Sequence, residues 1–159
     1  MNPAEIATSV LIEETLKESP AYRKIGDALF AVKQGSTFVL IHVVPWSSDR
    51  ALCRCVAQMV KGIHMTGAFA LDLLELNAYL RLGAFAYDRK ERMLIFLHSI
   101  LGGDTLDKEE LLATVRDVAV IADEYDDKII KRYGGQTMKE SLADSIEVIL
   151  RRDVNTMRF

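Results

Sequence analysis

The sequence contains few of the residues that build disulfide or metal sites. Cys53 and Cys55 are its only cysteines, and it has three histidines among 159 residues. Two cysteines with one residue between them on a strand point to the same face, which disfavours an internal disulfide. A zinc site needs two further ligands, and no Cys-x-x-Cys pair is present. We therefore predict two small core residues at these positions, with no metal and no cofactor.

The sequence also lacks a membrane span, a leader and an excess of basic residues. No apolar run reaches the ~18 to 20 residues that a transmembrane helix needs. The opening residues, MNPAEIATSV, have neither the basic nor the apolar region of a signal peptide. The net charge is −3, whereas a general nucleic-acid binder usually carries a basic face. We expect a cytoplasmic protein, given its free thiols, that binds neither membrane nor nucleic acid.

What is present is an ordinary globular composition. Half of the residues are apolar and 27% are charged. A chain of this length fits one domain and can bury roughly 70% of its unfolded surface, so it needs no covalent staple.

The first half of the sequence predicts one helix followed by three strands. Asn2 and Pro3 form a helix start, and Ser19-Pro20 stops the helix. Two β-rich runs then flank Gln34-Gly35-Ser36, which is a hairpin signal. The stretch ALCRCVAQMVKGI, at 51–63, is ambiguous between helix and strand, and its composition favours a third strand.

The second half predicts a short helix, a second hairpin and a long helix. The short helix covers 68–76, and strands cover 79–87 and 93–101 around the charged turn DRKER. Asp107 and Glu110 form a capping box for the long helix, which ends at Gly134-Gly135. A further helix is predicted at about 138–150.

The predicted fold class is α+β, because short sequential hairpins imply an antiparallel sheet. The predicted order is α-βββ-α-ββ-α plus a C-terminal helix, with about five strands and with helices mainly on one face. We place a domain at 1–135 and a helical extension at 136–159.

Asn77 separates helical from strand-like periodicity in the stretch LLELNAYLRLGAFAYDRKERMLIFLHSIL, at 73–101. An Asn can end a helix because its side chain bonds nearby backbone. The strands that follow are apolar on both faces, although helices can cover only one. Phe85 and Tyr87 are predicted on the second face, where they would need a partner chain, a bound segment or the tail helix.

The same stretch resembles the YbjN family, which shares the fold of type III secretion chaperones. The similarity lies in a helix that ends in Leu-Asn, a strand with Gly-x-Phe, an Asp-led turn and an apolar return strand. The stretch LDKEELLATVRDVAVIADEYDDKI resembles the last helix of the family. The resemblance covers roughly residues 2 to 133 and looks closest to the cyanobacterial branch.

The resemblance implies a small chaperone-like domain, often dimeric, that binds a partner segment and catalyses nothing. We therefore predict a non-enzymatic interaction module that homodimerises or holds a peptide segment through an apolar sheet face. The predicted partner-binding residues are aromatic side chains, since large rigid aromatics are common hot spots: Trp46, Tyr79, Phe85 and Tyr87.

An alternative function rests on two histidines inside apolar strands. If His42 and His98 meet across the sheet, they could serve a small-molecule sensor or a minor enzyme, because imidazole titrates near neutral pH. Two satisfied structural histidines are the simpler interpretation.

Overall fold

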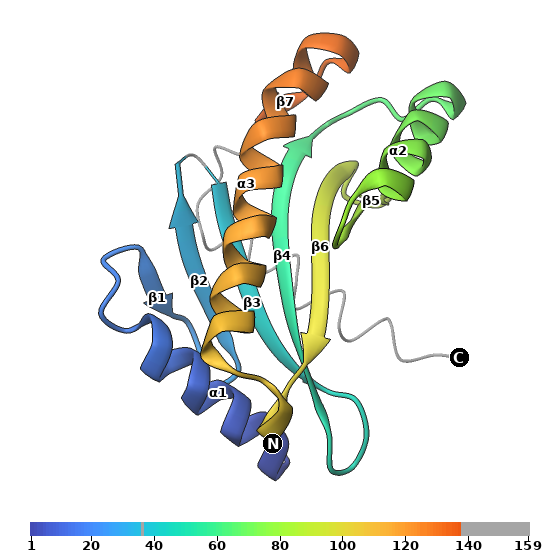
Figure 1. The fold of residues 1–159 in the computed structure, drawn as a ribbon. Helices are drawn as coiled ribbons and strands as arrows, with labels where there is room; N and C mark the ends of the chain where they lie inside the picture. Colours follow the sequence, from blue (N-terminus) through green and yellow to red (C-terminus); the bar gives the residue numbers. More distant parts are fainter. Residues whose placement is uncertain (36, 138–159) are drawn as a thin grey trace.

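An antiparallel β-sheet forms the centre of the computed structural model, which describes residues 1–35 and 37–137 (Figure 1). Its six main strands follow the order β1-β2-β3-β4-β6-β5, and a two-residue strand, β7, pairs with β4. The strand bounds are β1 Tyr22–Lys24, β2 Leu29–Gln34, β3 Thr37–Pro45, β4 Ala51–Lys61, β5 Ala84–Asp88, β6 Met93–Leu101 and β7 Gln136–Thr137.

Among the described residues, three α-helices accompany the sheet: α1 Pro3–Leu16, α2 Gly67–Tyr79 and α3 Lys108–Tyr133, with a short 3₁₀ turn, η1 Gly103–Thr105, before α3. The predicted starts of α1 and α3 are confirmed. Asn2 forms a complete capping box with Glu5, and Asp107 accepts a hydrogen bond from the Glu110 backbone N–H. The α+β class and the antiparallel sheet are confirmed as well.

The helices α1 and α3 lie over one face of the sheet, here called the first face, and α2 lies at the β5 edge (Figure 1). The main core cluster fills the space between α3 and the first face. In the middle of β3, every second residue belongs to this cluster, as in Val39, Ile41 and Val43, because side chains of a strand point to opposite faces in turn.

The opposite, second face of the sheet carries a smaller buried cluster of Ala31, Leu40, Val56, Met93 and Ile95. These residues come from β2, β3, β4 and β6, so the cluster crosses the middle of the sheet. The central strands are therefore apolar on both sides, which explains their near-continuous hydrophobic runs.

The prediction that Asn77 ends a helix is wrong, since α2 continues to Tyr79. The amide of Asn77 pairs with the outer edge of β5 instead. Its Oδ1 accepts a hydrogen bond from the Phe85 backbone N–H at 2.7 Å, and its Nδ2 donates to the Phe85 carbonyl at 3.2 Å. The side chain thus takes the place of a neighbouring strand at the free edge of the sheet.

The sheet has one more main strand than the five or so predicted. The additional strand, β1, is only three residues long and follows Pro20, so it has too few residues to show a period. The predicted helix at 138–150 lies outside the described residues, while β7 joins 136–137 to the sheet. Within the described part of the chain, no helix is long and apolar enough to cross a bilayer.

Candidate functional site

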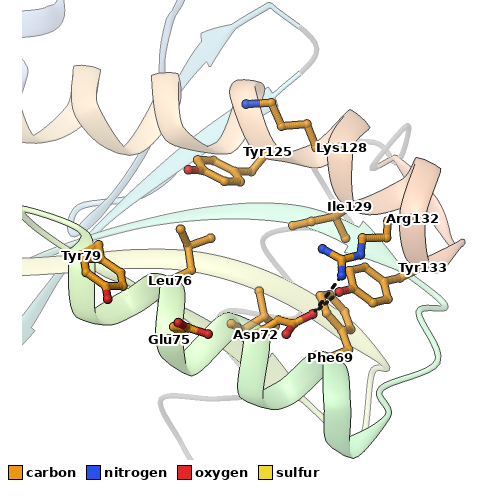
Figure 2. A pocket seen from close by; sticks show the side chains of 11 residues that line it. Phe69, Asp72, Glu75, Leu76, Tyr79, Tyr125, Lys128, Ile129, Arg132 and Tyr133 are labelled. Carbon is orange, nitrogen blue, oxygen red and sulfur yellow. Dashed lines mark hydrogen bonds and ion pairs between the residues drawn. The ribbon is translucent and has the colours of Figure 1, made fainter.

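A groove of about 460 Å³ lies between α2 and α3, two helices that are far apart in the sequence. Within the part of the chain that the structure describes, its walls and floor come from these two helices alone (Figure 2). The lining residues are Phe69, Asp72, Leu73, Glu75, Leu76, Tyr79, Tyr125, Lys128, Ile129, Arg132 and Tyr133.

The α2 wall follows from the spacing of its apolar residues. Thr66 caps the helix, because its side chain accepts a hydrogen bond from the Phe69 backbone N–H. Phe69, Leu73 and Leu76 then recur three or four residues apart, which places them on one side of the helix. Phe69 and Leu73 are buried, whereas Leu76 is half-buried and contributes to the floor of the groove.

The α3 wall combines an apolar floor with two cations. Tyr125 and Ile129 are one helical turn apart, as are Lys128 and Arg132. The Lys128 ammonium lies 4.9 Å from the centre of the Tyr125 ring and forms an ion pair with Glu124 at 2.7 Å. The hydrogen bond to Glu124 raises the pKa of Lys128, so the ammonium keeps its proton, and the Glu124 carboxylate offsets part of its charge.

One end of the groove is closed by contacts between the two helices. The rings of Phe69 and Tyr133 stack with centres 3.8 Å apart. Asp72 accepts a hydrogen bond from the Tyr133 hydroxyl and lies 3.6 Å from the Arg132 guanidinium (Figure 2). The hydrogen bond to Asp72 raises the pKa of Tyr133, so the hydroxyl keeps its proton and remains a donor.

The other end of the groove is open and is marked by Tyr79, whose side chain is 79% exposed. Glu75 lies between this end and Asp72 on the α2 wall (Figure 2). The groove therefore has an apolar floor between an acidic wall on α2 and a basic wall on α3. Such a surface can hold an apolar segment of another protein.

The chain matches a protein family over residues 7–141. The family is described as "T3SS (YopN, CesT) and YbjN peptide-binding chaperone 1". The chain belongs to this peptide-binding chaperone family. No curated protein matches the chain. The family resemblance predicted from the sequence is confirmed.

Residues of the family-like pattern build the base of this groove. Leu76 lines the groove and Asn77 holds β5. Gly83 adopts a left-handed conformation, with φ of +69°, directly against the Phe96 ring, and its N–H donates a hydrogen bond to His98 Nδ1. Asp88 leads the next turn by accepting from the Lys90 and Glu91 backbone N–H groups. The residues of this pattern therefore line the groove or hold the strands on which α2 rests.

Phe85 and Tyr87 lie on the first face, so the prediction that they are on the second face is wrong. The Phe85 side chain is 6% exposed and packs edge-on against Phe96 of β6 and Tyr125 of α3, at 5.1 and 5.5 Å between ring centres. The Tyr87 hydroxyl donates a hydrogen bond to the Ile63 carbonyl. Phe85 thus packs between the sheet and Tyr125, on the side of the ring away from the groove, and is too buried to contact a partner.

The two remaining predicted residues are exposed but far from each other. Trp46 is 55% exposed and lies at the hairpin between β3 and β4, where the Arg50 guanidinium is 5.9 Å from its ring centre. Tyr79 lies at the end of α2. Of the four predicted partner-binding residues, only Tyr79 therefore lines the groove.

His42 and His98 are on opposite faces of the sheet, so the idea that they meet is wrong. His98 pairs in register with Cys55, a residue of the first-face core, whereas His42 pairs with Arg54, the residue before it. Strand β4 also lies between the two histidine strands. These two imidazoles cannot share a proton or a ligand.

Cys53 and Cys55 are fully buried in the first-face core, as predicted. A hydrogen bond with Cys53, together with burial, raises the pKa of the Cys55 thiol. Both side chains therefore act as small apolar residues that pack against the helices.

In the sequence, most groove residues look like ordinary core residues or show no recognisable signal. Leu73, Leu76, Tyr125 and Ile129 appear in sequence only as the apolar stripes of two helices. One feature of the sequence could have indicated a binding surface on α2. Leu71 and Leu74, on the outer side of this helix, are apolar as well. A helix that is apolar on more than one side needs more than one partner surface.

Proposed function

We propose that the protein is a non-enzymatic, chaperone-like adaptor that holds an apolar segment of a partner protein in the groove between α2 and α3. The family description as peptide-binding chaperones supports the class of function. The observation that carries the proposed site is the apolar floor, open at Tyr79 and bordered by opposite charges on its two walls. Apolar contact supplies affinity in such a site, and the charges select the partner.

If peptides bind at the proposed site, Leu76→Glu should strongly weaken peptide binding. A carboxylate in the floor would have to be desolvated by the bound segment, so we expect an affinity loss of at least about tenfold. The probe is a phage-displayed library of random linear peptides, enriched on the wild-type protein and then measured against both proteins.

The matched control for this experiment is Val120→Glu, which introduces the same charge at an exposed apolar position of α3 outside the groove. This variant should retain full binding. Peptides that bind wild-type protein and Leu76→Glu equally well would place the binding site elsewhere. Circular dichroism of both variants confirms that the fold is retained.

We also propose that the protein is a homodimer in which the outer side of α2 packs against a second copy. Leu71 and Leu74 are 67% and 64% exposed, one turn apart, on the side of α2 that does not line the groove. Two such helices can cover each other around a twofold axis, because the same apolar patch is present on both copies. The proposed dimer would leave both grooves accessible.

The dimer proposal predicts that Leu71→Lys with Leu74→Lys gives a monomer. Light scattering after size exclusion should report twice the chain mass of 17.9 kDa for wild-type protein and the single chain mass for the variant. Both leucines are exposed, so the change should alter the free energy of unfolding of the monomer by less than about 0.5 kcal/mol. A dimer that survives the double change would exclude this interface.

A further inference from the structure

We infer, on the basis of the proposed function, that the segment held in the groove is an amphipathic helix with one basic flank and one acidic flank. The first reason concerns the backbone. All lining residues belong to α2 and α3, whose interior N–H and C=O groups are bonded within each helix. The groove therefore presents side chains only, and no strand edge borders it.

An extended segment in this groove would carry one N–H and one C=O per residue that the walls cannot pair. Buried backbone groups without partners are strongly disfavoured, which is why extended peptides usually dock against sheet edges. The nearby β5 edge is already paired at Phe85 by the Asn77 amide. A helix satisfies its own backbone groups, so it is the form that this groove accepts.

The open part of the groove sets how much of the partner helix it can hold. From Leu73, next to the closed end, to Tyr79 at the open end, the groove follows α2 over about 10 Å at 1.5 Å per residue. About two turns of a partner helix would lie there, with apolar side chains at i, i+4 and i+7 facing the floor, and the rest would extend past Tyr79. The contacted floor residues would be Leu73, Leu76, Tyr125 and Ile129.

The charges on the walls define the two flanks of the bound helix. Glu75 makes no hydrogen bond or ion pair with any described residue and lies on the α2 wall, where it can receive a Lys or Arg. Lys128 and Arg132 on the α3 wall each pair with one carboxylate, that of Glu124 or Asp72, but their side chains are 60% and 72% exposed. Both cations can therefore also receive a Glu or Asp on the opposite flank. Reversing the helix end to end would exchange its flanks, so the charges also fix its direction.

The test uses designed helical peptides of about four turns, labelled for fluorescence anisotropy. The first peptide carries leucines at i, i+4 and i+7, lysines on one flank and glutamates on the other. Two further peptides carry lysines on both flanks or glutamates on both flanks. A fourth has the composition of the first with prolines in its middle, so that it cannot form a helix.

We expect the mixed-charge helix to bind most tightly, about threefold to tenfold better than either single-charge peptide at low salt, because exposed ion pairs are individually weak. The preference should decline as salt screens the charges. Glu75→Lys makes the α2 wall basic, so this variant should instead prefer the peptide with glutamates on both flanks. Glu14→Lys makes the same change on α1, outside the groove, and should retain the wild-type preference.

The outcomes separate this inference from the proposed function. If the proline peptide binds as well as the helical one and Leu76→Glu blocks both, the groove holds peptides but the helical form is refuted. Equal binding of all three helical peptides would refute the charged flanks. If the designed helices fail while library peptides show sensitivity to Leu76→Glu, only the helix inference falls. If neither set shows that sensitivity, the proposed site falls as well.

Discussion

Phe85→Ser should remove most of the stability of the fold. The ring lies between Phe96 of the sheet and Tyr125 of α3 and is almost fully buried. Truncating a buried Phe costs about 3 to 5 kcal/mol of unfolding free energy. A serine hydroxyl left without a partner there adds about 1 to 3 kcal/mol. This sum is comparable with the 5 to 15 kcal/mol that stabilises a typical domain.

The measurement is urea unfolding followed by circular dichroism, with Tyr79→Ser as the matched control. Tyr79 is an aromatic residue of the same groove region but is 79% exposed, so its replacement should change the unfolding free energy by less than about 0.5 kcal/mol. Tyr79→Ser should nevertheless weaken peptide binding. If Phe85→Ser unfolds at the wild-type urea concentration, the ring cannot lie beneath Tyr125.

This expectation reverses the one that the sequence alone supports. In the sequence, Phe85 belongs to a strand that is apolar on both sides, and the alternation does not tell which side the helices cover. The structure decides the question through β5–β6 pairing, in which Phe85 lies opposite Phe96, a residue of the first-face core. The register of the β5–β6 hairpin, together with the face that α3 covers, thus determines whether an aromatic residue is core or binding surface.

The helix α3 could be predicted almost completely from its sequence, because its information is local. Asp107 caps its start, and Gly134, at φ of +75°, ends it. In the sequence, six apolar residues recur three or four positions apart along this helix, which predicts one buried stripe. Five of them are buried, and the sixth, Tyr125, is half-buried because it faces the groove. The buried positions are Leu111, Val115, Val118, Ala122 and Ile129.

The groove could not be predicted, because it depends on contacts between residues that are far apart in the chain. Asp72 and Tyr133 are 61 residues apart and meet only when α2 lies beside the end of α3. Asn77 shows the same effect. Its amide is used by the β5 backbone, so α2 continues past a residue whose local preference is to end a helix.

Gly83→Ala should be the most damaging single-methyl change in the chain segment that supports the groove. Gly83 has φ of +69°, where a side chain costs about 1 to 2 kcal/mol. A Cβ built there would lie 2.5 Å from Phe96 Cζ and 2.9 Å from the Leu97 carbonyl oxygen. The ring is packed beneath Phe85 and the carbonyl belongs to β6, so neither can move freely. Overpacking of this kind adds about 1 to 3 kcal/mol.

Two other glycines serve as controls, which separate the cost of the backbone conformation from the cost of the steric clash. Gly62 has φ of +71° with open space around its Cβ position, so Gly62→Ala should show the backbone cost alone, about 1 to 2 kcal/mol. Gly67, the first residue of α2, has open space and no positive φ, so Gly67→Ala should be neutral or stabilising. Urea unfolding of the three variants should therefore rank Gly83→Ala as the least stable. If Gly83→Ala is no less stable than Gly62→Ala, then β5 does not pack against Phe96 as described, and the floor of the groove would lose the support that Phe85 gives to Tyr125.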